Sequence, residues 1–385
     1  MLVLTIVVLE AAAMATLAAA FVLNATGRVP YEDLLLAAGA ALSAIGGSVV
    51  VLTGYIIAFH VFATAREQRR QERVRGWSVW WRGLLQYTRR DVAGELPREA
   101  FDAFLDLREV LSSEENERLA VLADRYGIAE QLAGRLATKK QTRRLDALQD
   151  LARARLAPAL PAIVAQLRDP EPLVRRHALR AAARTLARIP AAVRAAGVEA
   201  FVRALREVDL PPSLLAESML LLEEAAAEVV APILADPASH QPALQAALVA
   251  AGRRELRGLA EAVLPFVDHP EPEVRAAALR ALAGMGRLPA GGEAAVVARV
   301  DDERPFVRVH AARAAALLPI ESAGEVLWRR LGDSSWWVRL AAAESLGALG
   351  AAGRSDLERA ALDHPDRFAR DMAQQALADL RWKAA

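Results

Sequence analysis

The feature that most constrains this chain is a segment that recurs along its C-terminal two thirds. Residues 268–286 read DHPEPEVRAAALRALAGMG, and close copies occur at residues 168–187, 301–318, 333–350 and 363–380. When the last four copies are aligned on their shared arginine, the spacings are 33, 31 and 31 residues. A fixed period of this size is typical of a solenoid.

Each copy has the composition of a turn followed by a helix. Acidic residues and prolines form the turn, and apolar residues then recur at helical spacing, as at Val274, Ala278 and Leu282. Because proline is excluded from helix interiors, we expect each helix to begin just after the prolines. A second short apolar segment precedes each turn, so every repeat is predicted to be a pair of antiparallel helices.

The pattern D-x-x-P-x-V-R-x-x-A-x-x-A-L resembles that of HEAT repeats, in particular the short bacterial HEAT-like type also found in phycobilin lyases. The resemblance implies an all-α fold with a right-handed α-solenoid over residues 141–385. Two middle repeats carry Ala216 and Leu244 where the arginine is expected. Arg143, which lies 32 residues before Arg175, indicates an earlier repeat with a divergent turn.

The resemblance also implies a structural role for the repeated arginine. In HEAT-like repeats such an arginine pairs with turn acids and helps neighbouring repeats to stack, and partner binding is the alternative. The matching acids are Asp169, Asp268, Asp302, Asp333 and Asp363, and the arginines are Arg175, Arg275, Arg308, Arg339 and Arg370.

Two further sets of residues are candidates for partner binding. If the second helices line the inner curve, the position five residues after the repeated arginine forms a ladder on the concave surface, where solenoids bind partners. A solvated face is the alternative for these residues, and core or cap packing is the alternative for a group of tryptophans. The candidates are Arg180, Arg280, Arg313 and Glu344 on the ladder, and Trp328, Trp336 and Trp337 in the last repeats.

Apolar residues make up 54% of the chain, and the excess is concentrated at the N-terminus. Residues 2–23 and 34–63 each meet the length of about 20 residues that a membrane-spanning helix needs. We therefore predict a two-helix transmembrane hairpin over residues 1–64. A cleaved signal peptide is the alternative for the first run, but a positively charged region before it is missing.

Arginines predict the orientation of this hairpin. They are dense in residues 65–91, whereas the connection between the spans holds only Arg28. The positive-inside rule then places both termini and the solenoid in the cytoplasm, at a bacterial inner membrane. Trp77, Trp80 and Trp81, together with Tyr87, are interleaved with these arginines. This is typical of contact with anionic lipid headgroups, and nucleic-acid binding is the alternative.

Four residues within the spans are singled out as membrane contacts. An ionisable residue such as Glu10 normally faces protein or water inside a bilayer, although it can also stay protonated or lie near the interface. Gly39, Ser43 and Gly47 have the small-x-x-x-small spacing that lets helices approach closely, so the hairpin is expected to pack on itself or on another membrane protein.

Residues 92–140 lack the repeat pattern and are predicted to form a helical cap on the solenoid. The chain has no cysteine, which excludes thiolate catalysis and cysteine-ligated metals. No phosphate loop, HExxH, GxSxG or EF-hand pattern is present, so we expect neither an enzyme nor a cofactor.

These features predict a membrane-anchored scaffold that binds a partner protein, as an accessory subunit of a membrane enzyme or transporter. An envelope polysaccharide glycosyltransferase is one such partner. A small-ligand lyase or chaperone of the HEAT-like lyase type and nucleic-acid binding on the concave face remain the alternatives. The near-neutral charge of the solenoid argues against nucleic acid.

Overall fold

The structure is a computed structural model that describes residues 2–28, 30–86, 96–236 and 239–384. All regular secondary structure of these residues is helical. The chain divides into two compact units, Met1–Leu107 and Arg108–Ala385, which are described separately. Residues 87–91 of the predicted juxtamembrane segment, with Tyr87 among them, and residues 92–95 of the predicted cap lie outside the described residues.

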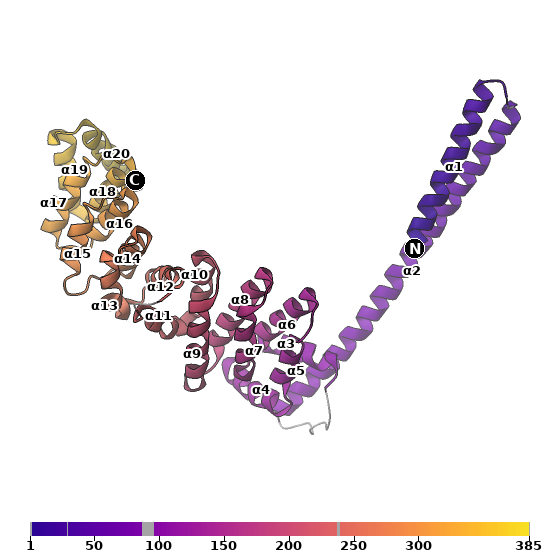
Figure 1. Ribbon diagram of the computed structural model, residues 1–385, viewed down its shortest axis with the longest axis horizontal. Helices are drawn as coiled ribbons and strands as arrows, with labels where there is room; N and C mark the ends of the chain where they lie inside the picture. The colour runs from indigo at the N-terminus through magenta and orange to yellow at the C-terminus, as the bar shows by residue number, and fades with distance from the viewer. Residues whose placement is uncertain (1, 29, 87–95, 237–238, 385) are drawn as a thin grey trace. The chain divides into compact units, whose positions relative to one another are not determined.

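The first unit is built on a helical hairpin (Figure 1). Helix α1 (Leu2–Ala25) leads through a turn at Gly27, whose φ is 70°, into helix α2 (Tyr31–Leu85). At about 1.5 Å per residue, the 55 residues of α2 extend for about 80 Å. The second predicted span and the basic segment after it are therefore parts of one continuous helix, which ends before α3 (Arg98–Val110).

The two helices of the hairpin meet along a heptad-like seam. Among residues 10–25 of α1, the least exposed positions are Glu10, Ala13, Leu17, Ala20 and Asn24, which are spaced alternately by three and four residues. Helix α2 contributes a matching row that is most buried at its centre, Ala41. This spacing is the one that packs side chains of two helices into each other along a narrow stripe.

Gly39, Ser43 and Gly47 lie on the exposed side of α2 and not on this seam. A Cβ atom added at Gly39 or Gly47 would meet no atom within 4 Å. Of the two alternatives for these residues, packing of the hairpin on itself is therefore contradicted, and packing on another membrane protein stays a prediction. Other residues of α2, with Ala41 at their centre, form the seam, which leaves the face with Gly39, Ser43 and Gly47 open.

One helix of the described residues, α2, is long and apolar enough to cross a membrane, and only 6% of its most apolar stretch is buried. Residues Glu10–Ala25 of α1 form a shorter apolar helix.

The second unit is a stack of helix pairs. A helix α4 (Ser113–Arg125) precedes the pairs, and its N-cap is Ser112, which forms a capping box with Glu115. The first helices of the pairs are α5 (Ile128–Gly134), α7 (Leu160–Ala165), α9 (Ala191–Glu207), α11 (Ala226–Leu234), α13 (Ala260–Val263), α15 (Gly292–Arg299), α17 (Ile320–Arg330) and α19 (Gly350–Asp363). Several are extended by 3₁₀ turns: η1 (Ala157–Ala159), η2 (Gln166–Arg168), η3 (Glu223–Ala225), η4 (Arg257–Leu259) and η5 (Leu264–Asp268).

The second helices carry most of the repeat pattern. They are α6 (Gln141–Ala154), α8 (Pro172–Arg188), α10 (Pro212–Leu220), α12 (Gln241–Arg253), α14 (Pro272–Met285), α16 (Pro305–Ala315), α18 (Trp336–Ala348) and α20 (Arg367–Ala384). Four of these eight, α8, α10, α14 and α16, begin on the last proline of the turn and not after it, because the fixed φ of proline suits the first helical position and no hydrogen bond is lost there.

Successive second helices pack on one another along the stack, as α12 does on α14 and α14 on α16. From α10 onward they approach more closely than successive first helices do, so they line the inner side of the curve (Figure 1). The core lies between the two layers and is made of small and branched residues. Leu215, Met219 and Leu222 are part of it, so the apolar stretch around α10 is core and not a contact patch.

Candidate partner-binding and membrane-facing surfaces

The repeated arginine joins each repeat to two turns. In its own turn, Arg308 donates from Nη1 to the carbonyl oxygen of Asp302 at 2.9 Å. From Nε and Nη2 it donates to both carboxylate oxygens of Asp333, in the next turn, at 2.8 Å. Arg275 binds Asp302 of the following turn in the same way, at 2.9 and 3.0 Å. The side chain therefore acts as a cross-link between consecutive repeats.

This geometry corrects two details of the sequence interpretation. The arginine binds backbone carbonyl oxygens of its own turn and the carboxylate of the next turn, so Asp268 and Asp363 are not its partners. The repeat before α8 uses Arg144, which pairs with Asp169 at 3.0 Å, and not Arg143.

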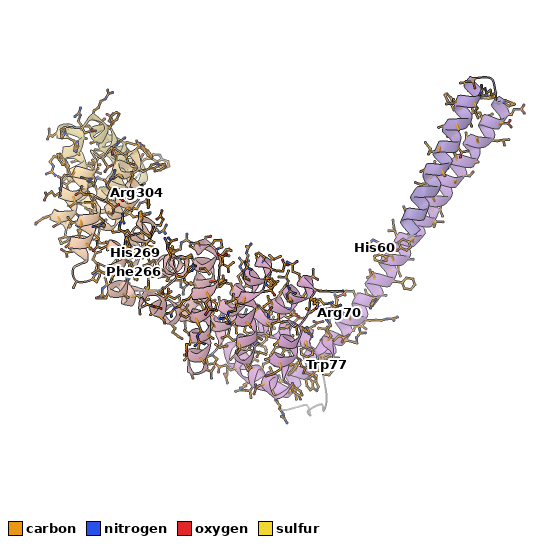
Figure 2. The ribbon with its side chains drawn as sticks, viewed as in Figure 1. His60, Arg70, Trp77, Phe266, His269 and Arg304 are labelled. Atoms are coloured by element: carbon orange, nitrogen blue, oxygen red, sulfur yellow. The ribbon has the colours of Figure 1, made fainter. Side chains whose placement is uncertain are left out.

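The acid that receives the arginine also organises its own turn. Six residues before each repeated arginine, Asp169, Asp302 and Asp333 accept a hydrogen bond from the backbone N–H two residues on. His269 and His364 occupy the same place and accept the equivalent bond on Nδ1 at 3.1 Å. Phe266 lies against His269 at this turn (Figure 2). Histidine thus accepts the same backbone hydrogen bond as the aspartate, but it has no carboxylate that an arginine of the preceding repeat could bind.

The series of arginine–aspartate cross-links between consecutive repeats is therefore interrupted at places that can be identified. Arg175 precedes a turn in which Leu210 stands in place of the aspartate, and Arg339 precedes His364. Both arginines keep the bonds to their own turns but have a buried Nε without a partner. Arg339 instead lies over the ring of Phe368, at 5.3 Å. Arg370, in the last second helix, binds the carbonyl oxygens of His364 and Pro365 only.

Where the arginine–aspartate pair is present, burial and hydrogen bonding together set the pKa of the aspartate carboxyl. Burial by itself raises the pKa of Asp302 and Asp333, but the hydrogen bonds from Arg275 or Arg308 and from backbone N–H groups outweigh it. The pKa of each carboxyl therefore lies below its usual range. The hydrogen bond to Asp333 in turn raises the pKa of Arg308.

The ladder on the second helices lies on the inner side of the stack, and most of its charges are neutralised. Arg180 pairs with Glu217, and Arg313 lies 3.6 Å from Glu344. Arg280 is different, because it has no carboxylate partner among the described residues.

Basic side chains surround Arg280. Burial and the nearby Arg253 lower the pKa of Arg280. Burial, then Arg280 and Arg313, lower the pKa of His310 to about 4.

The tryptophans of the last repeats fall into two groups. Trp328 is half-buried and packs on the His364 ring with centroids 4.4 Å apart, so it fills the gap between two repeats. Trp336 and Trp337 are exposed and pack edge to face on each other. Sequence reasoning missed that Phe306 and Phe368 are exposed at the same repeat position as Trp337. Alignment on the repeated arginine, two residues later, would have found this row.

In the hairpin, Glu10 is half-buried on the seam, and the Ser48 hydroxyl donates to its Oε1 at 2.5 Å. The same hydroxyl lies 2.9 Å from the carbonyl oxygen of Ile45. The carboxyl of Glu10 therefore has a protein partner on the other helix. Ser48 was not singled out from the sequence.

Trp81 cannot contact lipid headgroups, which corrects the sequence interpretation. Its ring is fully buried against Phe104, with centroids 5.5 Å apart, and its Nε1 donates to the carbonyl oxygen of Ala100 at 3.0 Å. Trp77 and Trp80 are half-buried and pack edge to face on each other. The aromatic group thus joins α2 to the first turns of α3.

Two of the basic residues of α2 are also engaged by α3. Arg70 donates to Asp102 at 2.8 Å, and Arg73 donates to Glu99 at 3.0 Å (Figure 2). These ion pairs are exposed and individually weak. Arg66, Arg69 and Arg75 are exposed on the same part of the helix.

Comparisons with known proteins agree with the repeat architecture. Residues 293–378 match the family model of HEAT repeats. Among curated proteins, none matches the chain. The chain is similar to Kap121p bound to Nup53p, with 15% identity and a TM-score of 0.50 over 73% of this chain and 36% of that one. The karyopherin Kap121p bound to the extreme C-terminus of the protein phosphatase Cdc14p gives the same values.

An engineered protein is 21% identical over 75% of this chain and 86% of its own, with a TM-score of 0.36. At these identities the likeness to Kap121p shows the fold alone, and the match spans about a third of Kap121p (36%). The repeat pattern, the family match and the fold together make this chain an all-helical, HEAT-like solenoid. Such a fold is suited to a protein-binding scaffold.

Proposed function

We propose that this chain is a membrane-anchored HEAT-like scaffold. The hairpin of α1 and α2 crosses a bacterial inner membrane, and the stack of helix pairs binds a partner protein at the cytoplasmic face. The chain acts as an accessory subunit of a membrane enzyme or transporter and has no catalytic role of its own. The observation that carries the proposal is the exposed apolar surface of α2 in a chain whose remainder is a repeat stack.

Residues 34–63 of α2 contain no acidic or basic side chain except His60, which lies on this helix (Figure 2). Leu36, Val50 and Phe62 are each more than 70% exposed in this run, at 71, 72 and 75%. Contiguous apolar surface of this extent is rare on soluble proteins. A bilayer would cover it, and a helix satisfies its backbone hydrogen bonds internally, as hydrocarbon requires.

The distribution of arginine supports a cytoplasmic solenoid. Arg66, Arg69 and Arg75 follow the apolar run and are exposed, whereas Arg28 is the only arginine in the connection between the helices. The positive-inside rule places the arginine-rich side in the cytoplasm. These side chains are also free to meet anionic headgroups, which attract basic residues next to a membrane span.

The open small-residue face of α2 supports a partner with its own membrane segment. Gly39, Ser43 and Gly47 form one stripe that α1 does not cover, and such stripes allow close helix packing in lipid. A partner held there would be confined beside the repeat stack, and confinement raises its effective concentration at the stack. The protein partners bound to Kap121p support this use of the fold.

Topology is tested by cysteine labelling, because the natural chain has no cysteine to interfere. We expect Thr26→Cys to react with a membrane-impermeant maleimide in intact spheroplasts. Glu199→Cys, on the exposed surface of α9, should react only after lysis. Labelling of both before lysis would overturn the orientation. Release of the protein from membranes at alkaline pH would overturn the anchor itself.

Partner capture is tested with the full chain in mild detergent. We expect a defined membrane protein to co-purify with the natural chain and to be lost when Gly39, Ser43 and Gly47 are all replaced by leucine. The control replaces Val49 and Ile56 by leucine, which changes exposed apolar positions about a third of a turn away from the stripe. Equal recovery with both variants would contradict the role of the stripe.

A further inference from the structure

The inner side of the stack has a hollow between α12 and α14. It has a volume of about 340 Å³ and is lined by Leu248, Val249, Gly252, Arg253, Glu255, Arg280, Ala281 and Gly284. Its position on consecutive second helices places it on the surface that a bound partner would follow.

Glycine shapes the floor of this hollow. A Cβ atom at Gly252 would lie 2.7 Å from the Cα atom of Ala281, and one at Gly284 would lie 2.7 Å from the carbonyl oxygen of Gly252. The two helix backbones are therefore in contact, with no side chain between them. Close contact on the floor leaves the longer side chains, Arg253 and Arg280, at the rim.

The rim carries positive charge that the protein leaves uncompensated. Arg253 and Arg280 come from different helices, and neither has a carboxylate within ion-pair distance among the described residues. Glu255, also on the rim, lies 3.5 Å from Arg257 instead. Elsewhere on this side of the stack, Arg180 and Arg313 each have a glutamate of the next repeat. The α12–α14 step thus has two guanidinium groups that line one hollow, and neither forms an ion pair with a described residue.

Neighbouring groups show that the local potential is positive. The pKa of Arg280 is lowered by burial and by Arg253, and the pKa of His310 is lowered by burial, Arg280 and Arg313. Each shift is in the direction expected for a base among other positive charges. An anion bound in the hollow would relieve both repulsions.

We infer that this hollow is a docking point for the carboxylate groups of an acidic segment of a partner protein, held between Arg253 and Arg280. Guanidinium groups bind carboxylates through paired N–H donors, which suits a short acidic segment crossing one step of the stack. A long continuous polyanion such as nucleic acid is disfavoured, because the unpaired positive charge is confined to this step and the neighbouring Arg180 and Arg313 already have glutamate partners. The inference rests on the proposed protein-binding function and names its site and chemistry.

The test uses the full chain in detergent and a fluorescent octaglutamate peptide, with binding followed by anisotropy. We expect R253Q/R280Q to weaken binding about tenfold or more, the change that about 1.4 kcal/mol produces. The control R203Q/R329Q removes the same charge from exposed arginines of the first helices α9 and α17. It should leave binding within about twofold, because long-range charge is screened by salt. Circular dichroism checks that both variants are folded.

Charge reversal supplies a second readout. R253E/R280E should lose octaglutamate binding and gain binding to octalysine, which the natural chain should bind weakly. Equal loss of octaglutamate binding in the two glutamine variants would overturn the site. Tighter binding of a single-stranded oligonucleotide than of octaglutamate, with the same dependence on Arg253 and Arg280, would overturn the assignment to protein. Neither result bears on the membrane anchor, which the cysteine labelling tests independently.

Discussion

Arg308 and Asp333 are 25 residues apart in the sequence, yet two N–H groups of the arginine donate to the carboxylate at 2.8 Å. Only 12% of the arginine side chain and 3% of the aspartate side chain are exposed. The pair fixes α16 to the turn that begins the next second helix. Because that turn uses the same carboxylate to cap itself, one aspartate sets both the local turn and the spacing of the repeats.

Removing the Arg308 side chain should lower the stability of the folded chain. We expect Arg308→Ala to lower the free energy of unfolding by about 3 kcal/mol, because Asp333 is left buried without its counter-charge. Urea denaturation followed by circular dichroism measures the change. Arg175→Ala is the matched control, because its next turn offers no carboxylate, and it should cost about 1 kcal/mol. Similar costs for the two variants would show that the cross-link adds nothing.

Acid should weaken the stack through the same carboxyls. The pKa of Asp302 and of Asp333 is lower in the folded chain than the ordinary 3.8. Their contribution is therefore full above the unfolded value, about 4, and is lost as the pH falls through the folded values. We expect the free energy of unfolding to fall as the pH is lowered below about 4, and to continue to fall until the pH has passed the folded pKa values of the two carboxyls.

Replacing both acids by asparagine separates this effect from general acid instability. D302N/D333N should be less stable at neutral pH and should lose less stability on acidification than the natural chain does. Glu303→Gln, at an exposed position, should keep the natural pH dependence. An unchanged acid response in the double variant would contradict the assignment.

The interrupted step at His364 can be completed. In the natural chain the buried Nε of Arg339 has no partner, so replacement of Arg339 by alanine removes no carboxylate pair. In a His364→Asp background, the same replacement should cost about 1 to 2 kcal/mol more. The double-mutant cycle isolates this coupling from the loss of the Trp328–His364 contact. A coupling near zero would mean that the turn cannot present the new carboxylate.

Trp81 should matter for stability and not for lipid binding. Trp81→Ala removes a fully buried ring and its bond to Ala100, and we expect a loss of about 3 kcal/mol. Trp77→Ala, at a half-buried position, should cost about half as much or less. Protease cleavage between α2 and α3 reports the loosening of this junction. Faster cleavage in the Trp77 variant than in the Trp81 variant would reverse the ranking.

Gly252 should tolerate no side chain. Gly252→Ala places a Cβ atom 2.7 Å from the backbone of α14, so we expect destabilisation of about 2 kcal/mol from forced separation of the helices. Gly54→Ala in α2 is the control, because nothing lies within 4 Å of the new atom and alanine favours helix. Thermal unfolding measured by circular dichroism compares the two. A harmless Gly252→Ala would mean that α12 and α14 separate easily.

The fold was predictable because its signals are local and repeated. Period, turn prolines and apolar spacing recur in each copy, so the helix pairs at α14, α16 and α18 followed directly from their letters. The partner of each arginine was harder to predict. Arg275 binds a carboxylate in another repeat, and in its own turn it binds only backbone carbonyl oxygens. Asp268 was chosen in place of His269 because the sequence does not show which residue caps the turn.

The residues predicted to contact a membrane were harder to place for a related reason. Gly39, Ser43 and Gly47 share one face of α2, but sequence spacing does not say whether that face meets α1. Trp81 matched the composition of an interfacial anchor, whereas its burial depends on α3, whose approach no local pattern encodes. The hollow beside Arg280 was missed because it requires the contact of Gly252 with Ala281.

The arginine–aspartate cross-links are missing between some repeats, and this has a mechanical consequence. Arginine–aspartate cross-links join α6 to α8, α14 to α16 and α16 to α18. The steps from α8 to α14 lack them, because Leu210 stands in place of the aspartate and Ala216 and Leu244 stand in place of the arginine. Between α8 and α14, bending therefore meets no buried arginine–aspartate pair, and the repeats are held by apolar packing and by more exposed ion pairs such as Arg180–Glu217. A stack that lacks the buried pair in its middle and at its last step can tighten or relax around a bound object at those places without breaking such a pair.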